Sequence, residues 1–189
     1  MMENEPKIHR FEWGDEGQDC LTWQSGEDRV LQAMVAKAKP IPESYDFPVL
    51  TRLFVEPDIG PPSDFANHIR VGAIVANLRA TELLVSFLQE NDQIIRLPSD
   101  CGDYNLIHIT TVLDCLDVDH CEGVWLEPRK RAAALFECRF KAAALSGPQI
   151  FRVPEKLAYV FVTDAVADAL LSSHLGGYQL YGPYDVDRP

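Results

Sequence analysis

The stretch KLAYVFVTDAVADALLSSHLGGYQLYG, residues 156–182, predicts a strand, a capped helix, a glycine turn and a second strand. The apolar run at its start stops at Thr163 and Asp164, two residue types that cap helix N-termini. Apolar residues then recur at helical spacing. Gly176 and Gly177 predict a left-handed end of this helix, because glycine reaches positive φ at little cost. The order of these signals predicts a compact α+β module.

The rest of the chain predicts strands and helices in alternation. Strand-like patterns lie at residues 8–13, expected as a short edge strand, and at 49–55, 93–97, 104–113, 123–126 and 149–153. Helices are expected at 27–39 and, after an Asn77 cap, at 78–90, whereas 132–145 fits either state. Prolines and glycines indicate a loop over 56–67 and a tail over 183–189. We therefore expect one α+β domain with a mostly antiparallel or mixed sheet and a few packed helices.

The length of 189 residues fits one domain with a sizeable core. We expect residues 1–45 to form an N-terminal arm or a first strand and helix, residues 46–189 to form the main α+β domain, and both to make one folded unit. No apolar run approaches the roughly 20 residues of a membrane span. The acidic, polar N-terminus lacks the pattern of a secretory signal. These features predict a cytoplasmic protein that does not enter membranes.

The five cysteines are odd in number and irregularly spaced, which is typical of free thiols in a reducing compartment. One alternative is a small enzyme with a thiol or carboxylate centre, since a nucleophilic cysteine needs a base and an orienting third group. The residues available for such a centre are Cys101, Cys115, His108 and Asp114. Motifs for phosphate binding, zinc hydrolases and serine hydrolases are absent from the sequence. We expect no cofactor.

The net charge of −12 disfavours nucleic acid and anionic membranes as partners and suits a basic protein. Solubility alone accounts equally well for this acidity. The densest acidic patch comprises Asp114, Asp117, Asp119 and Glu122. Three interpretations remain open for it: a solvated loop, a docking surface for a cationic partner, or a metal site. The spacing does not match that of a calcium-binding loop.

Several ordered blocks together resemble the immunity-protein family 11 domain of bacterial polymorphic toxin systems. The blocks are residues 62–65 before an apolar segment and helix at 74–88, then 94–98, 104–109 and 112–117, and finally 150–153, 159–164 and 175–180. The resemblance covers about residues 45–183. The sequence departs from the family pattern after Asp117, where Val118-Asp119-His120 replaces an expected small hydroxyl residue. The resemblance implies an α+β protein that binds and neutralises a cognate toxin, with no catalytic residues and hence no enzymatic activity.

A neutralising protein benefits from electrostatic steering, which speeds association with an oppositely charged partner. Aromatic side chains are frequent anchors in such interfaces. Trp13, Trp23 and Trp125 lie close in sequence to acidic residues, so they are predicted partner contacts together with the acidic patch. Core packing is the alternative role for each of them. A regulatory subunit of a larger complex remains a further alternative to the toxin-binding function.

Overall fold

The computed structural model describes residues 6–14, 21–26, 28–52, 63–66, 72–145 and 147–187. This part of the chain forms a single compact α+β domain, which confirms the predicted fold class. The expected loop over 56–67, the Pro62 end of one family-like block, and Cys20 fall wholly or partly outside the described residues. None of the described helices has the length and apolar character needed to cross a membrane.

The larger sheet has five strands in the order β10-β13-β1-β12-β11. Their bounds are Arg139–Lys141, Tyr178–Asp187, Lys7–Trp13, Val160–Thr163 and Ile150–Phe151. All neighbours are antiparallel except β10 and β13, so the sheet is mixed. The prediction of an edge strand at 8–13 was wrong, because β1 lies at the centre. Ile8 and Phe11 are both buried on opposite faces of β1, as a central strand between two layers requires.

The C-terminal tail predicted at 183–189 is also corrected. Strand β13 continues to Asp187, where it pairs with β1 on one side and with β10 on the other. Val186, near its end, is buried. The proline-rich composition suggested a tail, but backbone pairing with two segments that are distant in sequence extends the strand.

The second sheet has four antiparallel strands in the order β4-β5-β7-β6. Their bounds are Phe65–Ala66, Ala73–Asn77, Tyr104–His108 and Gln93–Arg96. Strand β5 leads directly into α2 (Leu78–Leu84), which continues as a 3-10 turn, η1 (Val85–Phe87). The predicted Asn77 cap is confirmed, since its side-chain oxygen accepts a hydrogen bond of 3.0 Å from the Ala80 amide.

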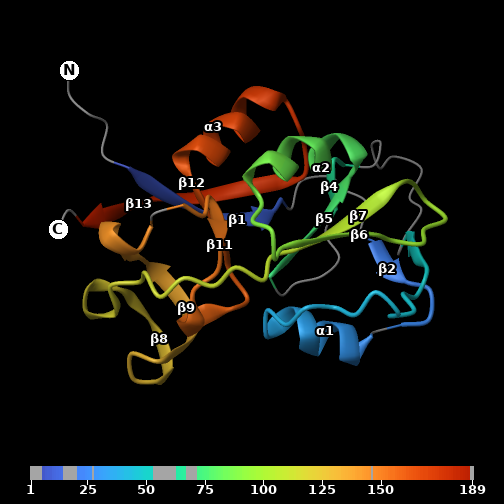
Figure 1. The fold of residues 1–189 in the computed structure, drawn as a ribbon. Helices are drawn as coiled ribbons and strands as arrows, with labels where there is room; N and C mark the ends of the chain where they lie inside the picture. The colour runs from blue at the N-terminus through green and yellow to red at the C-terminus, as the bar shows by residue number, and fades with distance from the viewer. Residues whose placement is uncertain are drawn as a thin grey trace.

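Helices α2 and α3 (Asp164–Ser173) lie together on one side of the two sheets (Figure 1). On the other side, α1 (Arg29–Ala36) packs with β2 (Leu21–Trp23) and β3 (Leu50–Arg52) below the four-stranded sheet. A hairpin of β8 (Glu122–Glu127) and β9 (Arg131–Glu137) lies below the five-stranded sheet. The described residues among the first 45 therefore include a central strand, β1, and a helix that packs in the core, α1.

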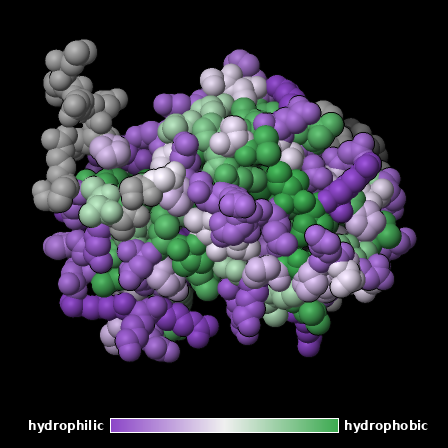
Figure 2. Space-filling view, viewed as in Figure 1, coloured by the Kyte–Doolittle hydropathy of each residue, from purple (hydrophilic) through white to green (hydrophobic). Residues whose placement is uncertain are grey.

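The segment 132–145, which fitted helix or strand, forms strands. Strand β9 (Arg131–Glu137) pairs with β8 (Glu122–Glu127), and a short 3-10 turn, η3 (Ala142–Ala144), follows β10. Alanines favour a helix in isolation. Burial of Ala132 and Leu135 against the core overrides that preference. Figure 2 shows hydrophobic surface over α2 and many hydrophilic side chains over the region of this hairpin, where Val124, Leu126 and Phe136 are exposed as well.

The end of α3 differs in detail from the prediction. The residue in the left-handed conformation is His174, with φ of 56°, and not one of the two glycines. Gly177 has a positive φ of 97° at the start of β13, where a Cβ would lie 2.2 Å from the carbonyl oxygen of Phe65. Gly177 is therefore required for the close approach of two backbones, whereas Gly176 has open space around it.

A Gly177→Ala substitution should therefore lower the free energy of unfolding by about 2 kcal/mol, because it adds both backbone strain and a clash. The matched control is Gly176→Ala, whose added methyl group meets no atom within 4 Å. We expect the control to change stability by no more than about 0.5 kcal/mol. Urea unfolding of both variants measures the difference, and equal stabilities would contradict this account of Gly177.

Candidate partner-binding site

The predicted acidic patch forms a loop, residues 114–122, that is fastened to the sheet by backbone hydrogen bonds. The Asp117 amide donates to the Arg139 carbonyl at 2.7 Å, and the Lys141 amide donates to the Cys115 carbonyl at 2.8 Å. Cys115 and Leu116 are fully buried and anchor the loop from below. A short 3-10 turn, η2 (Val118–His120), follows. The loop is therefore part of the packed fold, and its acidic side chains are displayed from a fixed backbone.

The four carboxylates of the loop differ in their pairing. Asp119 forms an ion pair with Arg129, and Asp117 lies 2.7 Å from Nδ1 of His120. Asp114 and Glu122 are exposed, and neither has an ion-pair partner among the described residues. The hydrogen bond with His120 holds the pKa of the Asp117 carboxyl below its usual value. The structure thus places the predicted patch at the surface, with Asp114 and Glu122 as the carboxylates best placed to meet a cation.

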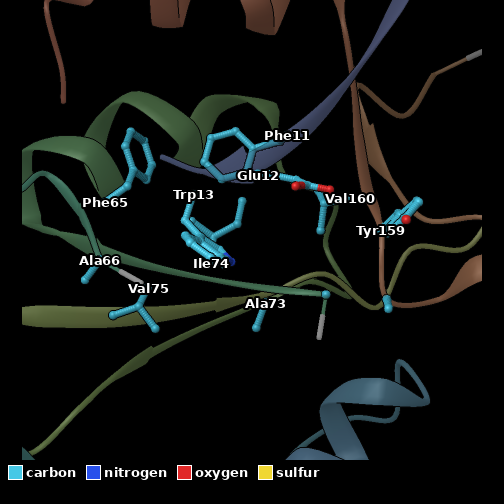
Figure 3. A pocket seen from close by; sticks show the side chains of 12 residues that line it. Phe11, Glu12, Trp13, Phe65, Ala66, Ala73, Ile74, Val75, Tyr159 and Val160 are labelled. Carbon is cyan, nitrogen blue, oxygen red and sulfur yellow. The ribbon is translucent and has the colours of Figure 1, made fainter. Parts of the chain in front are cut away.

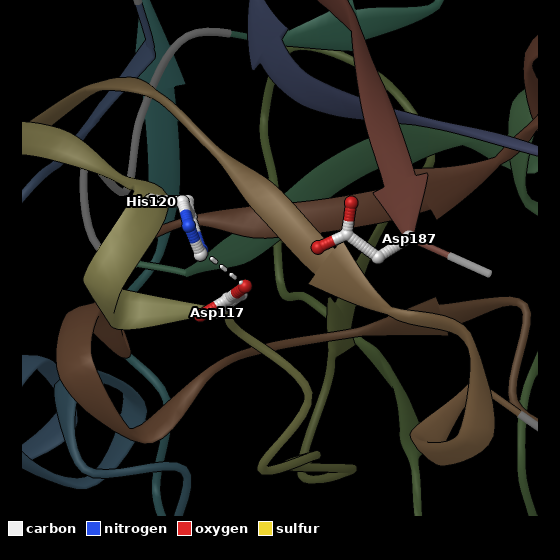
Figure 4. A group of neighbouring side chains, drawn as sticks. All are labelled: Asp117, His120 and Asp187. Atoms are coloured by element: carbon white, nitrogen blue, oxygen red, sulfur yellow. Dashed lines mark hydrogen bonds and ion pairs between the residues drawn. The ribbon is translucent and has the colours of Figure 1, made fainter. Parts of the chain in front are cut away.

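Asp117 and His120 also meet Asp187 from the end of β13 (Figure 4). The ligand atoms of the three side chains lie within 4.8 Å of one another, and carboxylate and imidazole groups are suitable ligands for a divalent cation. However, His120 already bonds Asp117, and the Arg139 guanidinium lies 3.5 Å from Asp187. These contacts account for the three side chains by themselves, so we assign no metal to them.

The three tryptophans have different positions. Trp23 is 3% exposed and packs in the core below the four-stranded sheet, so its prediction as a partner contact was wrong. Trp125 is half-buried and packs against the core below the five-stranded sheet. Trp13, at the end of β1, lines a cavity. Burial of Trp23 follows from tertiary packing, which the neighbouring acidic residues in the sequence did not reveal.

The cavity beside Trp13 has a volume of about 270 Å³ and lies between β1, β5 and residues 158–160 (Figure 3). Aromatic rings from Phe11, Trp13, Phe65 and Tyr159 contribute to its lining. Glu12 is the one carboxylate among the described residues that line it. The sequence indicates only one wall of this cavity, where Phe11, Glu12 and Trp13 are consecutive. The opposite walls come from residues 65–66, 72–75 and 158–160, which are distant in sequence.

The alternative thiol centre does not assemble from its four proposed residues. His108 is buried, and its two ring nitrogens lie 2.8 Å from the Lys39 carbonyl and 3.2 Å from the Arg152 guanidinium. Cys101 instead contacts Ser99 and the Leu50 carbonyl. Burial, together with the nearby charges of Glu155 and Asp114, raises the pKa of the Cys115 thiol to about 12. A neutral thiol and an occupied imidazole do not form an activated nucleophile.

The four described cysteines are free thiols, as the sequence predicts: Cys101, Cys115, Cys121 and Cys138. Burial raises the pKa of Cys138 to about 12 as well. Cys121 donates its thiol proton toward the Asp117 carbonyl at 3.1 Å. These thiols therefore serve mainly as buried or half-buried packing groups.

Glu155, in the 3-10 turn η4 (Pro154–Lys156), is a buried carboxylate that sequence reasoning missed. Only 7% of its surface is exposed, and Oε2 has no hydrogen-bond partner among the described residues. Burial raises the pKa of Glu155, and the charge of Asp114 raises it further. The short proline-containing sequence around Glu155 carries no signal for this burial.

A Glu155→Gln substitution should stabilise the protein at pH 8. Because the folded state raises the pKa, Glu155 favours folding only while it is protonated, and this benefit is lost as the pH rises through the folded-state pKa. We expect a higher melting temperature for the variant at pH 8 and a smaller gain at pH 4. Exposed Glu90→Gln makes the same change in net charge and serves as the control. An equal gain in both variants would attribute the effect to net charge alone.

No family model matches the chain, and no curated protein is significantly similar to it.

Proposed function

We propose that this protein is a non-enzymatic immunity protein that binds and neutralises a cognate toxin in the bacterial cytoplasm. The ordered sequence blocks that resemble the immunity family motivate this function. The observation that carries the proposal is the acidic loop, where Asp114 and Glu122 project from a backbone fastened to β10. The partner is a protein with a cationic surface, rather than a nucleic acid or a membrane.

The physical basis is electrostatic steering. A chain with a net charge of −12 attracts a cationic protein and repels phosphate-rich nucleic acid. Exposed, unpaired carboxylates contribute most to such steering because no neighbouring cation cancels their field. The half-buried Trp125 lies in β8, three residues after Glu122, the last residue of the acidic loop. It is a nearby aromatic candidate for the same interface.

The experiment is binding of the purified protein to the product of the reading frame next to its gene. We expect a stable complex and loss of toxicity. In the Asp114→Asn/Glu122→Gln double variant, the association rate constant should fall by about tenfold at low salt. The matched control is the Glu82→Gln/Glu90→Gln double variant. It also removes two exposed negative charges, one in α2 and one in the segment that follows this helix.

Two results would contradict the proposal. If the intact protein neither binds nor neutralises the toxin, the proposed immunity function is wrong. Equal association rates for the two double variants would leave an immunity function but place its contact surface away from the acidic loop.

A further inference from the structure

Two of the free cysteines lie opposite each other at the open end of the β8–β9 hairpin. Glu122 and Glu137 are the last opposed pair of this antiparallel ladder. Cys121 comes just before Glu122 and Cys138 comes just after Glu137, so the same register makes the two cysteines the next opposed pair. Both side chains pack in the core below the five-stranded sheet, so both lie on the inner face of the hairpin.

A hydrogen bond of Cys121 shows how near the two residues are. Its sulfur accepts from the Arg139 amide at 3.3 Å. The geometry of the peptide bond places this amide nitrogen about 2.4 Å from the Cα of Cys138. Sγ of Cys121 therefore lies within about 6 Å of the Cα that carries the second thiol.

The backbone pairing around the two cysteines is of the kind that a disulfide requires. Among the described residues, no backbone hydrogen bond joins Cys121 to Cys138. Opposed residues of an antiparallel pair that do not exchange such bonds have Cα atoms about 4.5 Å apart, with their side chains closest together. A disulfide needs Cα atoms roughly 4.4 to 6.8 Å apart and side chains that do not point away from each other. Rotation of the two side chains is then sufficient to join their sulfur atoms.

We propose that Cys121 and Cys138 are a reversible redox pair, which forms an intramolecular disulfide by exchange with a small organic disulfide. Cys121 reacts first, because it is half-buried whereas Cys138 is only 6% exposed. As a thiolate, Cys121 attacks one sulfur of the small disulfide and releases one small thiol. Cys138 then loses its proton and attacks the Cys121 sulfur of the mixed disulfide, which releases the second small thiol. The protein loses two electrons and two protons, and the small disulfide gains them.

The exchange should be slow at neutral pH. Burial raises the pKa of both thiols, to about 12 in Cys138, and the Arg139 amide partly offsets this rise at the Cys121 sulfur. The two thiols therefore remain packing groups until a small disulfide accumulates. Because the thiolate fraction grows with pH below the pKa, the rate of disulfide formation should rise about tenfold between pH 7 and pH 8. A time course stopped with acid measures this rate, and a rate independent of pH would overturn the thiolate mechanism.

The main test needs no protein partner and is therefore independent of the toxin. The full chain is treated with bis(2-hydroxyethyl) disulfide without denaturant, its remaining thiols are alkylated, and it is digested with trypsin. Trypsin cleaves after Arg129, Lys130 and Arg131, which separates Cys138 in peptide 132–139 from Cys121 in peptide 97–129. We expect the two peptides to be joined, with a mass about 2 Da below that of their reduced forms together, and to be separated by dithiothreitol. Absence of the joined peptides, or their formation only in urea, would overturn the proposal.

Variants identify the two sulfur atoms. Cys121→Ser should abolish the linkage. Cys101→Ser is the matched control and should leave it unchanged, since Cys101 is also half-buried and lies in the same tryptic peptide. Cys138→Ser should leave Cys121 as a mixed disulfide with the reagent, and an unmodified Cys121 in that variant would overturn the order of attack. A linkage that persists in Cys121→Ser, or that is lost in Cys101→Ser, would overturn the assignment.

The stability of the oxidised protein tests whether the native backbone accommodates the bond. A disulfide between Cys121 and Cys138 closes the hairpin into a loop and restricts the unfolded chain, so the melting temperature should rise by about 5 °C on oxidation. Thermal unfolding with and without dithiothreitol measures the difference. A lower melting temperature of the oxidised protein would show that the bond strains the hairpin, and would overturn the proposal.

Discussion

Replacing Arg152 with methionine should lower the free energy of unfolding by roughly 3 kcal/mol, the largest effect that we expect from one substitution. Arg152 is fully buried just after β11. Its guanidinium donates to the Val35 carbonyl at 2.6 Å, to the Leu157 carbonyl at 3.2 Å and to Nδ1 of His108 at 3.2 Å. Methionine fills a similar volume but leaves three buried acceptors without a donor.

These contacts explain why replacing Arg152 should destabilise several elements of the fold at once. Val35 belongs to α1, His108 ends β7, and Leu157 leads into β12. Arg152 thus joins the helix below one sheet to both sheets. Burial lowers its pKa only to about 10, so the guanidinium stays charged at neutral pH.

Guanidinium chloride unfolding of Arg152→Met measures the loss. The control is Arg96→Met, because Arg96 pairs with Asp103 at the surface and both side chains are 79% exposed. We expect the control to lie within about 0.5 kcal/mol of the native protein. Comparable stability of the two variants would show that the acceptors around Arg152 find other partners, and would contradict its joining role.

The protein should lose roughly 3 kcal/mol of stability between pH 6.5 and pH 4 because of His108 alone. Burial, with a smaller contribution from the Arg152 charge, lowers the pKa of His108 from 6.5 to about 4. As the pH falls, the unfolded chain takes up a proton at about 6.5 while the folded chain does not. The stabilising contribution is therefore complete above pH 6.5 and is lost as the pH falls through 4.

The same contacts determine the tautomer of His108. A carbonyl only accepts and a guanidinium only donates, so Nε2 carries the proton toward Lys39 and Nδ1 accepts from Arg152. Nitrogen NMR of labelled histidine at pH 6 should show a neutral ring with a protonated Nε2. A charged ring at that pH would contradict the burial argument.

A His108→Gln variant should have a flatter dependence of unfolding free energy on pH between 6.5 and 4, whatever its overall stability. The control is His174→Asn. His174 is exposed and has φ of 56°, a conformation that asparagine tolerates well. The control should keep the pH dependence of the native protein. Loss of that dependence in both variants would show that His108 is not its cause.

Several elements could be predicted because their signals act over a few residues. Asn77 caps α2 by bonding an amide three residues away, and β12 leads into α3 where the apolar run ends. The ambiguous segment 132–145 had no such decisive signal. Its strands depend on pairing with β8 and β13, and that pairing is a property of the folded chain.

The candidate sites divide in the same way. The acidic loop was predictable, because a dense run of carboxylates tends to remain in water, and Asp114 and Glu122 do so. The positions of the tryptophans could not be predicted. Trp13 and Trp23 are only ten residues apart, but Trp23 is buried in the core and Trp13 lines a cavity. Acidic neighbours in the sequence do not indicate which part of the fold a tryptophan side chain will contact.

The sequence by itself determined the α+β class, the order of most strands and helices, and the acidic character of the surface, because capping, periodicity and charge are local properties. Only the tertiary structure decided that β1 lies at the centre of a sheet, that Arg152 and His108 join two halves of the core, and that Glu12 faces a cavity. Each of these depends on contacts between residues far apart in the chain, and the closing strand β13 acquires its partners in that way.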